Sequence, residues 1–396
     1  MEVEALAQWA KKKGITLLGT GDFTHPTYFA DLKSKLEPSD NGLLRLKKGD
    51  QGVHYILTTE VSNIYTQDGK VRRIHDLIFA PSFEVVEAIR SKLGNLGKLS
   101  SDGRPIFSFS AKELVKMILD ISEDCLIIPA HAWTPWFSIF GANSGFDSIE
   151  ECFGEMSPYI RAIETGLSSD PAMNWRLSAL DAITLISNSD AHSPSRLGRE
   201  ANAFDCALNY RDVVGAIRNK DRRKLLFTIE FFPEEGKYHY DGHRQCGMIF
   251  NPKQTKVNQY LCPKCHKKLT VGVMHRVEDL ADRPEGFVPK NAIPSIHLIP
   301  LEEIISEAMG YRIGTKAVGN EYDRLIERGG SELQILLEAP PETLASFVPK
   351  KILDGIIHMR QGKVSIIPGH DGVYGKIALF TEKKEGEKSK EQLTLF

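Results

Sequence analysis

Short apolar runs alternate along the chain with stretches in which apolar residues recur at helical spacing. The runs predict buried strands, and they lie at 15–18, 54–59, 77–80, 125–129, 162–164 and 183–187. The first helical stretch places Val3, Leu6, Ala7 and Ala10 on one stripe, which Gly14 ends. A helix is therefore predicted over 2–13, before the first strand.

A second clear helix signal begins at Ser110. Glu113 follows three residues later as a capping box, and Leu114, Val115, Ile118 and Leu119 form the apolar face. Strands that alternate with helices are typical of βα units. They predict an α/β fold with a mainly parallel sheet, either open or closed into a barrel.

The pattern changes near Phe232, where Pro233, Glu234, Glu235 and Gly236 interrupt it. Helical spacing returns at 301–308 and again at 349–359. We therefore predict four parts: an α/β unit at 1–232, a Cys- and His-rich module at 233–290, a small helical domain at 291–381 and a disordered, charged tail at 382–396.

Composition narrows the class of protein. With 396 residues, 41% of them hydrophobic and 26% charged, the chain can bury a large core, which excludes a disordered chain or a disulfide mini-protein. The net charge of −2 means that nucleic-acid binding would need local basic patches. Because no apolar run reaches about 20 residues, we expect a cytoplasmic protein without a membrane partner.

Acidic residues and histidines stand where the predicted strands end. They are Asp22, His25, Glu60, His131, Glu164, Asp190 and His192, whereas His75 precedes its apolar run. In a parallel barrel the carboxyl ends of the strands converge on one face, so these side chains can meet and bind divalent metals. Taken alone, each residue is more often a buried, hydrogen-bonded histidine or a helix N-cap than a metal ligand, but their joint recurrence at strand ends favours metal.

The cysteines predict a second kind of site. His243 and Cys246 form one pair, Cys262 and Cys265 form another, and this spacing suits a closed tetrahedral zinc site. His239, His266 and His275 are alternatives to His243. Because four protein ligands leave no position for water, we expect one structural zinc without a chemical role.

Several basic residues are candidate contacts to DNA phosphates. They are Lys264, Lys267 and Lys268 beside the predicted zinc, the run 218–224, Lys350, Lys351 and Arg176. Solvated surface charge explains each of the lysines equally well.

Longer strings of residues carry a family resemblance. Residues 19–26 (GTGDFTHP), the pair Glu60 and His75, residues 129–133 (PAHAW), 164–171 (ETGLSSDP) and 189–192 (SDAH) resemble successive motifs of the polymerase and histidinol phosphatase (PHP) domain. Together with residues 173–178 (MNWRLS) and the cysteine module, the sequence resembles the endonuclease Q family within that superfamily.

The resemblance implies a distorted (β/α)7 barrel with a multinuclear site of Zn, Mn or Mg. Its implied metal ligands are His25, Glu60, His75, His131, Asp190 and His192, with Glu164 as a further one, and Asp190, Glu60 and Asp22 are the implied catalytic residues. It also implies cleavage of double-stranded DNA 5′ to deaminated bases such as hypoxanthine and uracil. Xanthine and abasic sites are further candidates. Trp133, Trp136 and Trp175 either line a pocket for the lesion base or pack in the core.

One family feature is missing from the printed sequence. The family begins with a strand carrying an Asp-x-His-x-His motif, and no such motif precedes the first predicted helix. The resemblance then implies a misplaced start, a truncated gene or a protein that binds fewer metals. A barrel that lacks its first strand exposes unpaired backbone unless another segment covers it.

The end of the sequence resembles the peptide by which bacterial DNA-maintenance enzymes dock on the sliding clamp. Gln392 would hydrogen-bond at the rim of an apolar groove, which Leu393, Leu395 and Phe396 would fill. We therefore expect a nucleoid-associated DNA repair endonuclease. The alternatives are a small-molecule phosphoesterase on the same barrel, or a lesion- or clamp-binding protein with impaired catalysis.

Overall fold

The computed structural model describes residues 2–49, 52–101 and 103–380. Its helices are α1 Val3–Lys13, α2 Pro26–Lys35, α3 Phe83–Gly94, α4 Ala111–Ile121, α5 Ile149–Phe153, α6 Pro171–Asn174, α7 Tyr210–Arg218, α8 Pro252–Val257, α9 Val273–Leu280, α10 Leu301–Met309, α11 Lys316–Gly329, α12 Pro341–Ala345 and α13 Lys350–Arg360. Its strands are β1 Leu17–Gly19, β2 Leu36–Pro38, β3 Leu44–Leu46, β4 His54–Gln67, β5 Lys70–Ala80, β6 Ile106–Phe107, β7 Leu126–Pro129, β8 Ala162–Glu164, β9 Thr184–Ile186, β10 Ala201–Phe204, β11 Leu225–Glu230, β12 Asp241–His243, β13 Met248–Phe250, β14 Ser295–His297, β15 Ser365–Ile367 and β16 Lys376–Ala378.

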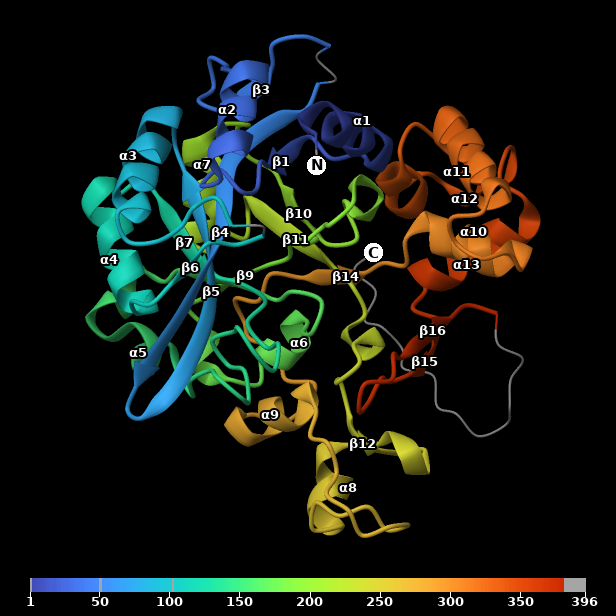
Figure 1. The fold of residues 1–396 in the computed structure, drawn as a ribbon. Coiled ribbons are helices and arrows are strands. Elements are labelled where there is room, and N and C mark those ends of the chain that lie inside the picture. The colour runs from blue at the N-terminus through green and yellow to red at the C-terminus, as the bar shows by residue number, and fades with distance from the viewer. Residues whose placement is uncertain (1, 50–51, 102, 381–396) are drawn as a thin grey trace.

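The strongest sequence patterns are confirmed as elements. The first apolar stripe forms α1, which Gly14 ends in a left-handed conformation. Ser110 and Glu113 cap α4 reciprocally, as the capping box requires. The apolar faces of α3 and α4 pack with Ile74 and Ile78 of β5 in the main core, and Figure 1 shows both helices along one flank of the β4–β5 hairpin.

The prediction of a mainly parallel sheet is wrong. Within the described residues the largest sheet has seven strands, and its centre is a long antiparallel hairpin of β4 and β5, next to which β7 also runs antiparallel. Asp68 and Gly69 join β4 to β5 with positive φ angles, so no helix crosses over between them. Parallel pairing occurs where β1 and β6 meet β4, between β8 and β9, and between β11 and β14. The fold is mixed α/β.

The segments before and after the Cys- and His-rich module pair in one sheet. β11 precedes the module and β14 follows it, and the two strands pair in parallel. In Figure 1 the module with β12 and α8 projects from one end, while α10 to α13 form a helical layer on the side. The four-part division at 232, 290 and 381 remains a prediction, and the tail at 382–396 lies outside the described residues.

In the described part of the chain, every helix is too short or too polar to cross a bilayer.

Candidate metal centre

The β4–β5 hairpin brings Glu60 and His75 together. Ser62 faces His75 in the antiparallel register, so Glu60 and His75 are diagonal neighbours on one face of the hairpin. The Nδ1 atom of His75 lies 2.8 Å from Oε1 of Glu60. His75 reaches this face although it precedes its apolar run, because β5 runs opposite to β4.

His131 completes a group of three. It follows β7, and its Nε2 atom lies 3.2 Å from both Oε1 of Glu60 and Nδ1 of His75. Ligand atoms bound to one ion at about 2.0–2.1 Å lie about 2.9–3.4 Å apart in tetrahedral or octahedral geometry. The three atoms are therefore spaced like one face of a coordination shell, and two imidazoles with one carboxylate suit a divalent transition metal.

Neighbouring groups orient His131. Its Nδ1 atom lies 3.1 Å from the Thr134 hydroxyl, and its backbone N–H donates to Oε2 of Glu164 at 2.8 Å. Asn188 donates to the other oxygen of Glu164 at 3.0 Å. These contacts give Glu164 the role of holding the backbone of His131, which has a φ of 31°. Such supporting hydrogen bonds are typical of metal-binding histidines.

The electrostatics of Glu60 and His75 suit a cation. Burial opposes ionisation of Glu60, but hydrogen bonds from His131 and His75 and the charge of Arg104 hold its pKa below the ordinary value. Burial lowers the pKa of His75, which favours the neutral imidazole that binds metal. The third side chain differs, because burial is outweighed by the hydrogen bond and charge of Glu60, which raise the pKa of His131 and favour its imidazolium while no ion is bound. Burial also raises the pKa of Glu164 to about 7, which fits a supporting role.

Arg104 is a residue of the site that the sequence analysis missed. Its Nε atom lies 2.5 Å from Oε1 of Glu60, and its Nη2 atom lies 3.5 Å from Oδ1 of Asp190. Arg104 belongs to no apolar run and to none of the motif strings, so the only signal was its charge.

The remaining predicted residues lie outside the group of three. Asp22 is exposed in the turn after β1, and His25 caps α2, where its Nδ1 accepts the Tyr28 N–H at 3.4 Å. Asp190 contacts Arg104, and the His192 side chain is 77% exposed with its Nδ1 2.9 Å from the Asp190 carbonyl oxygen.

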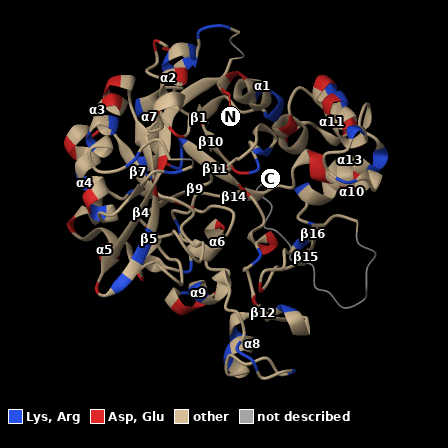
Figure 2. Ribbon diagram, viewed as in Figure 1, with Lys and Arg blue, Asp and Glu red and all other residues tan. Residues whose placement is uncertain are grey.

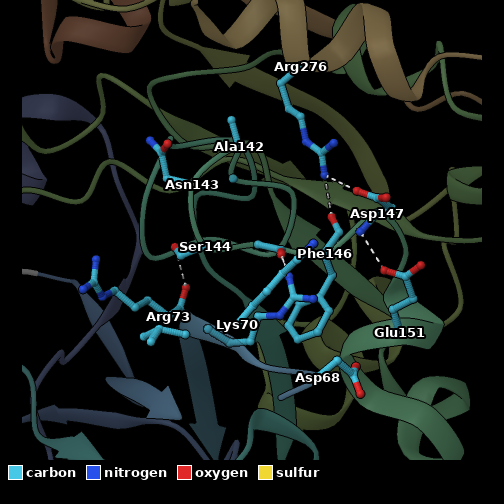
Figure 3. A pocket seen from close by; sticks show the side chains of 14 residues that line it. Asp68, Lys70, Arg73, Ala142, Asn143, Ser144, Phe146, Asp147, Glu151 and Arg276 are labelled. Carbon is cyan, nitrogen blue, oxygen red and sulfur yellow. Dashed lines mark hydrogen bonds and ion pairs between the residues drawn. The ribbon is translucent and has the colours of Figure 1, made fainter. Parts of the chain in front are cut away.

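Apart from the candidate metal centre, the β4–β5 hairpin lines a cavity of about 840 Å³ together with loop 141–147 (Figure 3). Phe137 links the two, since its ring lies 4.8 Å from the His75 ring and 5.7 Å from the Arg73 guanidinium. Arg276 of α9 donates to the Phe146 carbonyl and pairs with Asp147 on the far wall. The Arg276 contacts attach loop 141–147 to α9, and the Arg73 backbone N–H, which donates to the Ser144 carbonyl, holds the loop against the hairpin.

The structure also brings the predicted zinc ligands together. His243, Cys246, Cys262 and Cys265 offer ligand atoms that all lie within 4.8 Å of one another, and Cys265 Sγ is 3.7 Å from His243 Nδ1. Sulfur and nitrogen ligands of one tetrahedral zinc lie about 3.5–3.8 Å apart. The alternative His275 instead pairs with Asp241 at 2.7 Å. The donor set therefore fits a closed zinc site.

The candidate DNA contacts differ in exposure. Lys264, Lys267 and Lys268 are exposed beside the cysteines, and Lys350 and Lys351 are exposed at the start of α13. Arg176, by contrast, is 7% exposed and pairs with Glu278 of α9, so it packs inside the protein. Among the tryptophans, Trp133 is 1% exposed in the core and Trp136 is 45% exposed. Figure 2 shows basic residues on α8 and on the hairpin, mixed with acidic ones on the helices.

Several known proteins are similar to this chain. The family model for the MJ0043 C-terminal domain matches residues 300–363. Protein YqxK of Bacillus subtilis is 30% identical over 378 residues, which cover 94% of this chain and 91% of that protein. Protein MJ0043 of Methanocaldococcus jannaschii is 35% identical over 263 residues, which cover 64% of this chain and 32% of that protein. The chain thus spans about a third of the length of MJ0043.

Solved structures match over nearly the whole chain. The lesion-specific endonuclease PfuEndoQ of Pyrococcus furiosus superposes with a TM-score of 0.84 at 33% identity, over 97% of this chain and 93% of that one. An endonuclease Q bound to a 27-mer duplex with an abasic lesion at its active site gives a TM-score of 0.82, also at 33% identity, over 97% and 94%. The fold is therefore that of the lesion-specific DNA endonucleases. The chain belongs to the endonuclease Q family.

Proposed function

We propose that this protein is a metal-dependent DNA repair endonuclease that hydrolyses the phosphodiester 5′ to a deaminated base, with hypoxanthine and uracil as the main substrates. The observation that carries the proposal is the triangle of Glu60, His75 and His131 in a chain with the endonuclease Q fold. Xanthine and abasic sites are further substrates to test, and the duplex bound by one related endonuclease Q carries an abasic lesion at the active site.

The residues of the site have different roles in this proposal. Glu60, His75 and His131 hold a divalent ion, with Asp190 and Asp22 nearby as further carboxylates and His25 and His192 as further imidazoles. Thr134 and Glu164 keep His131 in place. When bound, the ion would supply Lewis acidity that stabilises the charge developing on the phosphate. Zn, Mn and Mg are the ions to compare.

We further propose that β1, β8, β9 and their neighbours form a barrel of the PHP type. Asp22, Glu164 and Asp190 support this, because each stands at or just after the carboxyl end of one of these strands. The exposed Lys267 and Lys268 of the zinc module, with Lys350 and Lys351, would then contact DNA phosphates.

Nicking of a labelled duplex tests the function. Duplexes carrying one deoxyinosine, one deoxyuridine, one abasic site or no lesion are incubated with Mn, Mg or Zn and with a chelator. We expect metal-dependent cleavage 5′ to the lesion and loss of at least about 100-fold in rate for Asp190→Asn and His75→Ala. The exposed Asp40→Asn provides the matched control, and it should cleave like the wild type.

The result also separates the alternatives. Cleavage of a small phosphate ester without cleavage of DNA would favour a small-molecule phosphoesterase. Retained binding of lesion DNA without cleavage under any metal would favour a binding protein, and either result would contradict the proposed function.

The proposed bacterial sliding-clamp partner rests on Gln392, Leu393, Leu395 and Phe396, which lie outside the described residues. A cytoplasmic, nucleoid-associated location is proposed on the same ground. Surface plasmon resonance with an immobilised bacterial clamp tests the contact. The Leu395→Ala/Phe396→Ala variant should lose binding but keep nicking of free duplex, and unchanged clamp binding would contradict the proposal.

A further inference from the structure

A guanidinium lies between two carboxylates of the candidate metal centre. Arg104 comes from the segment before β6, and its side chain is 27% exposed. It contacts Glu60 at 2.5 Å and Asp190 at 3.5 Å. Glu60 is on β4, whereas Asp190 follows β9, so this one side chain bridges two distant parts of the chain.

The contact with Glu60 uses the same oxygen that completes the group of three. Oε1 of Glu60 lies 2.8 Å from His75 Nδ1, 3.2 Å from His131 Nε2 and 2.5 Å from Arg104 Nε. An ion bound to this oxygen would stand beside a guanidinium that cannot lose its proton in proteins. A divalent ion at this site would therefore compete with Arg104 for one carboxylate oxygen.

We propose that Arg104 is a built-in counter-ion that competes with the divalent metal for Glu60 and Asp190. Before metal binds, it neutralises the two carboxylates and keeps them close together. Binding of the ion displaces the guanidinium from Glu60. Arg104 is thus a positioning residue that sets the metal affinity of the site, an inference that deepens the proposed function.

Metal titration of the full-length protein tests this inference without DNA. Free Mn²⁺ is followed by electron paramagnetic resonance, after elemental analysis has verified the zinc content. Removing the competing charge in Arg104→Gln should tighten Mn²⁺ binding at least about tenfold. Arg104→Lys keeps the positive charge on a shorter side chain, so its Mn²⁺ affinity should lie between those of Arg104→Gln and the wild type. Arg45→Gln removes an exposed arginine that pairs with Glu37, and it should leave the affinity unchanged.

Thermal unfolding gives a second readout that a merely structural role would not produce. Without Mn²⁺, Arg104→Gln should melt at a lower temperature than the wild type, because two carboxylates lose their counter-ion. With saturating Mn²⁺ the difference should vanish or reverse, since a ligand stabilises the form that binds it more tightly. Equal or weaker Mn²⁺ binding by Arg104→Gln, or an equal loss of stability with and without Mn²⁺, would overturn the proposal.

The outcome does not depend on the nature of the substrate. If the protein fails to cut DNA but Arg104→Gln binds Mn²⁺ more tightly, the proposed function fails and the competition stands. If the protein cuts lesion DNA but Arg104→Gln and the wild type bind Mn²⁺ with equal affinity, the proposed function stands and the proposed competition fails.

Discussion

Three residues at the site have backbone conformations that side chains rarely adopt. Asp22, His131 and Asp190 have φ angles of 44°, 31° and 42°. Aspartate and histidine are among the non-glycine residues that adopt a positive φ most often, but the conformation remains uncommon and needs support from its surroundings. For His131 the support is the Glu164 carboxylate that accepts its N–H. Strain of this kind is concentrated where a side chain must be held in a functional position.

Gly166 should be essential for the position of His131. A Cβ added at Gly166 would lie 2.6 Å from Cβ of His131, and Gly166 itself has a φ of 62°. We expect Gly166→Ala to destabilise the protein by about 1–3 kcal/mol and to weaken metal binding about 10- to 100-fold. Thermal unfolding and Mn²⁺ titration measure the two effects.

Gly42→Ala is the matched control, because Gly42 also has a positive φ but open space around its Cα. It should lose some stability and keep its metal affinity. Normal metal binding by Gly166→Ala would show that His131 does not depend on this glycine.

Glu200 should make stability depend on pH. It is 2% exposed, and burial together with the charges of Glu230 and Glu164 raises its pKa well above the ordinary value. The folded protein keeps this proton, whereas the unfolded chain releases it above about pH 4.3. The free energy of unfolding therefore falls as the pH rises from there, by about 1.4 kcal/mol per pH unit, until the folded-state pKa is passed.

Glu200→Gln removes this titration. Its stability relative to the wild type should rise with pH above about pH 5 in urea unfolding until the folded-state pKa of Glu200 is passed, while the exposed Glu342→Gln shows no such trend. A difference that stays constant with pH would mean that Glu200 is ionised in the folded protein.

At the scale of elements, the zinc module has little core of its own. Its buried cluster consists of Phe250, Cys262 and Leu269, and β12 and β13 are short. Such a small core does not stabilise a fold by itself, so the metal must contribute most of the folding free energy.

Removing one ligand should therefore unfold the module locally. Cys246→Ser is expected to lose about one equivalent of zinc and to speed hydrogen exchange at 239–272. The helices α10 to α13 should exchange as in the wild type. Cys206→Ser, which changes a cysteine outside the module, should retain its zinc, and zinc retention by Cys246→Ser would point to a different ligand set.

At the scale of the whole molecule, a buried ion pair connects the N-terminal helix α1 to the helical layer of α10 to α13. Lys13 of α1 lies 2.6 Å from Oε2 of Glu332, and both side chains are 5% exposed. The Tyr322 hydroxyl and the Leu301 N–H also donate to this carboxylate. The helical layer is thus attached to α1 through one fully engaged carboxylate.

Removing one partner of this buried pair should lower the free energy of unfolding much more than removing one partner of an exposed pair. Lys13→Met leaves the Glu332 charge buried without a cation, so we expect a loss of about 3–5 kcal/mol in urea unfolding. Lys12→Met removes the partner of Asp323 in an exposed pair and should change stability by about 1 kcal/mol or less. Adding Glu332→Gln to Lys13→Met should recover part of the loss, and no recovery would argue against the buried charge as the cause.

Local sequence patterns were enough to predict individual helices and strands and the kinds of ligand. The apolar stripe of α1, the capping box of α4 and the spacing of Cys262 and Cys265 are local patterns, which depend only on residues a few positions apart. Carboxylates and imidazoles at strand ends likewise predicted metal chemistry before any partner was known.

Which of these side chains meet depends on how distant segments pack against one another. The direction of β5 placed His75 beside Glu60, and the packing of separate segments brought in Arg104 and turned His192 outward. The physical reason is that alternation of polar and apolar residues records which face of a strand is buried, but not which strand lies beside it or in which direction. Pairing between distant segments sets both the neighbour of each strand and its direction. These two choices in turn set the geometry of the site.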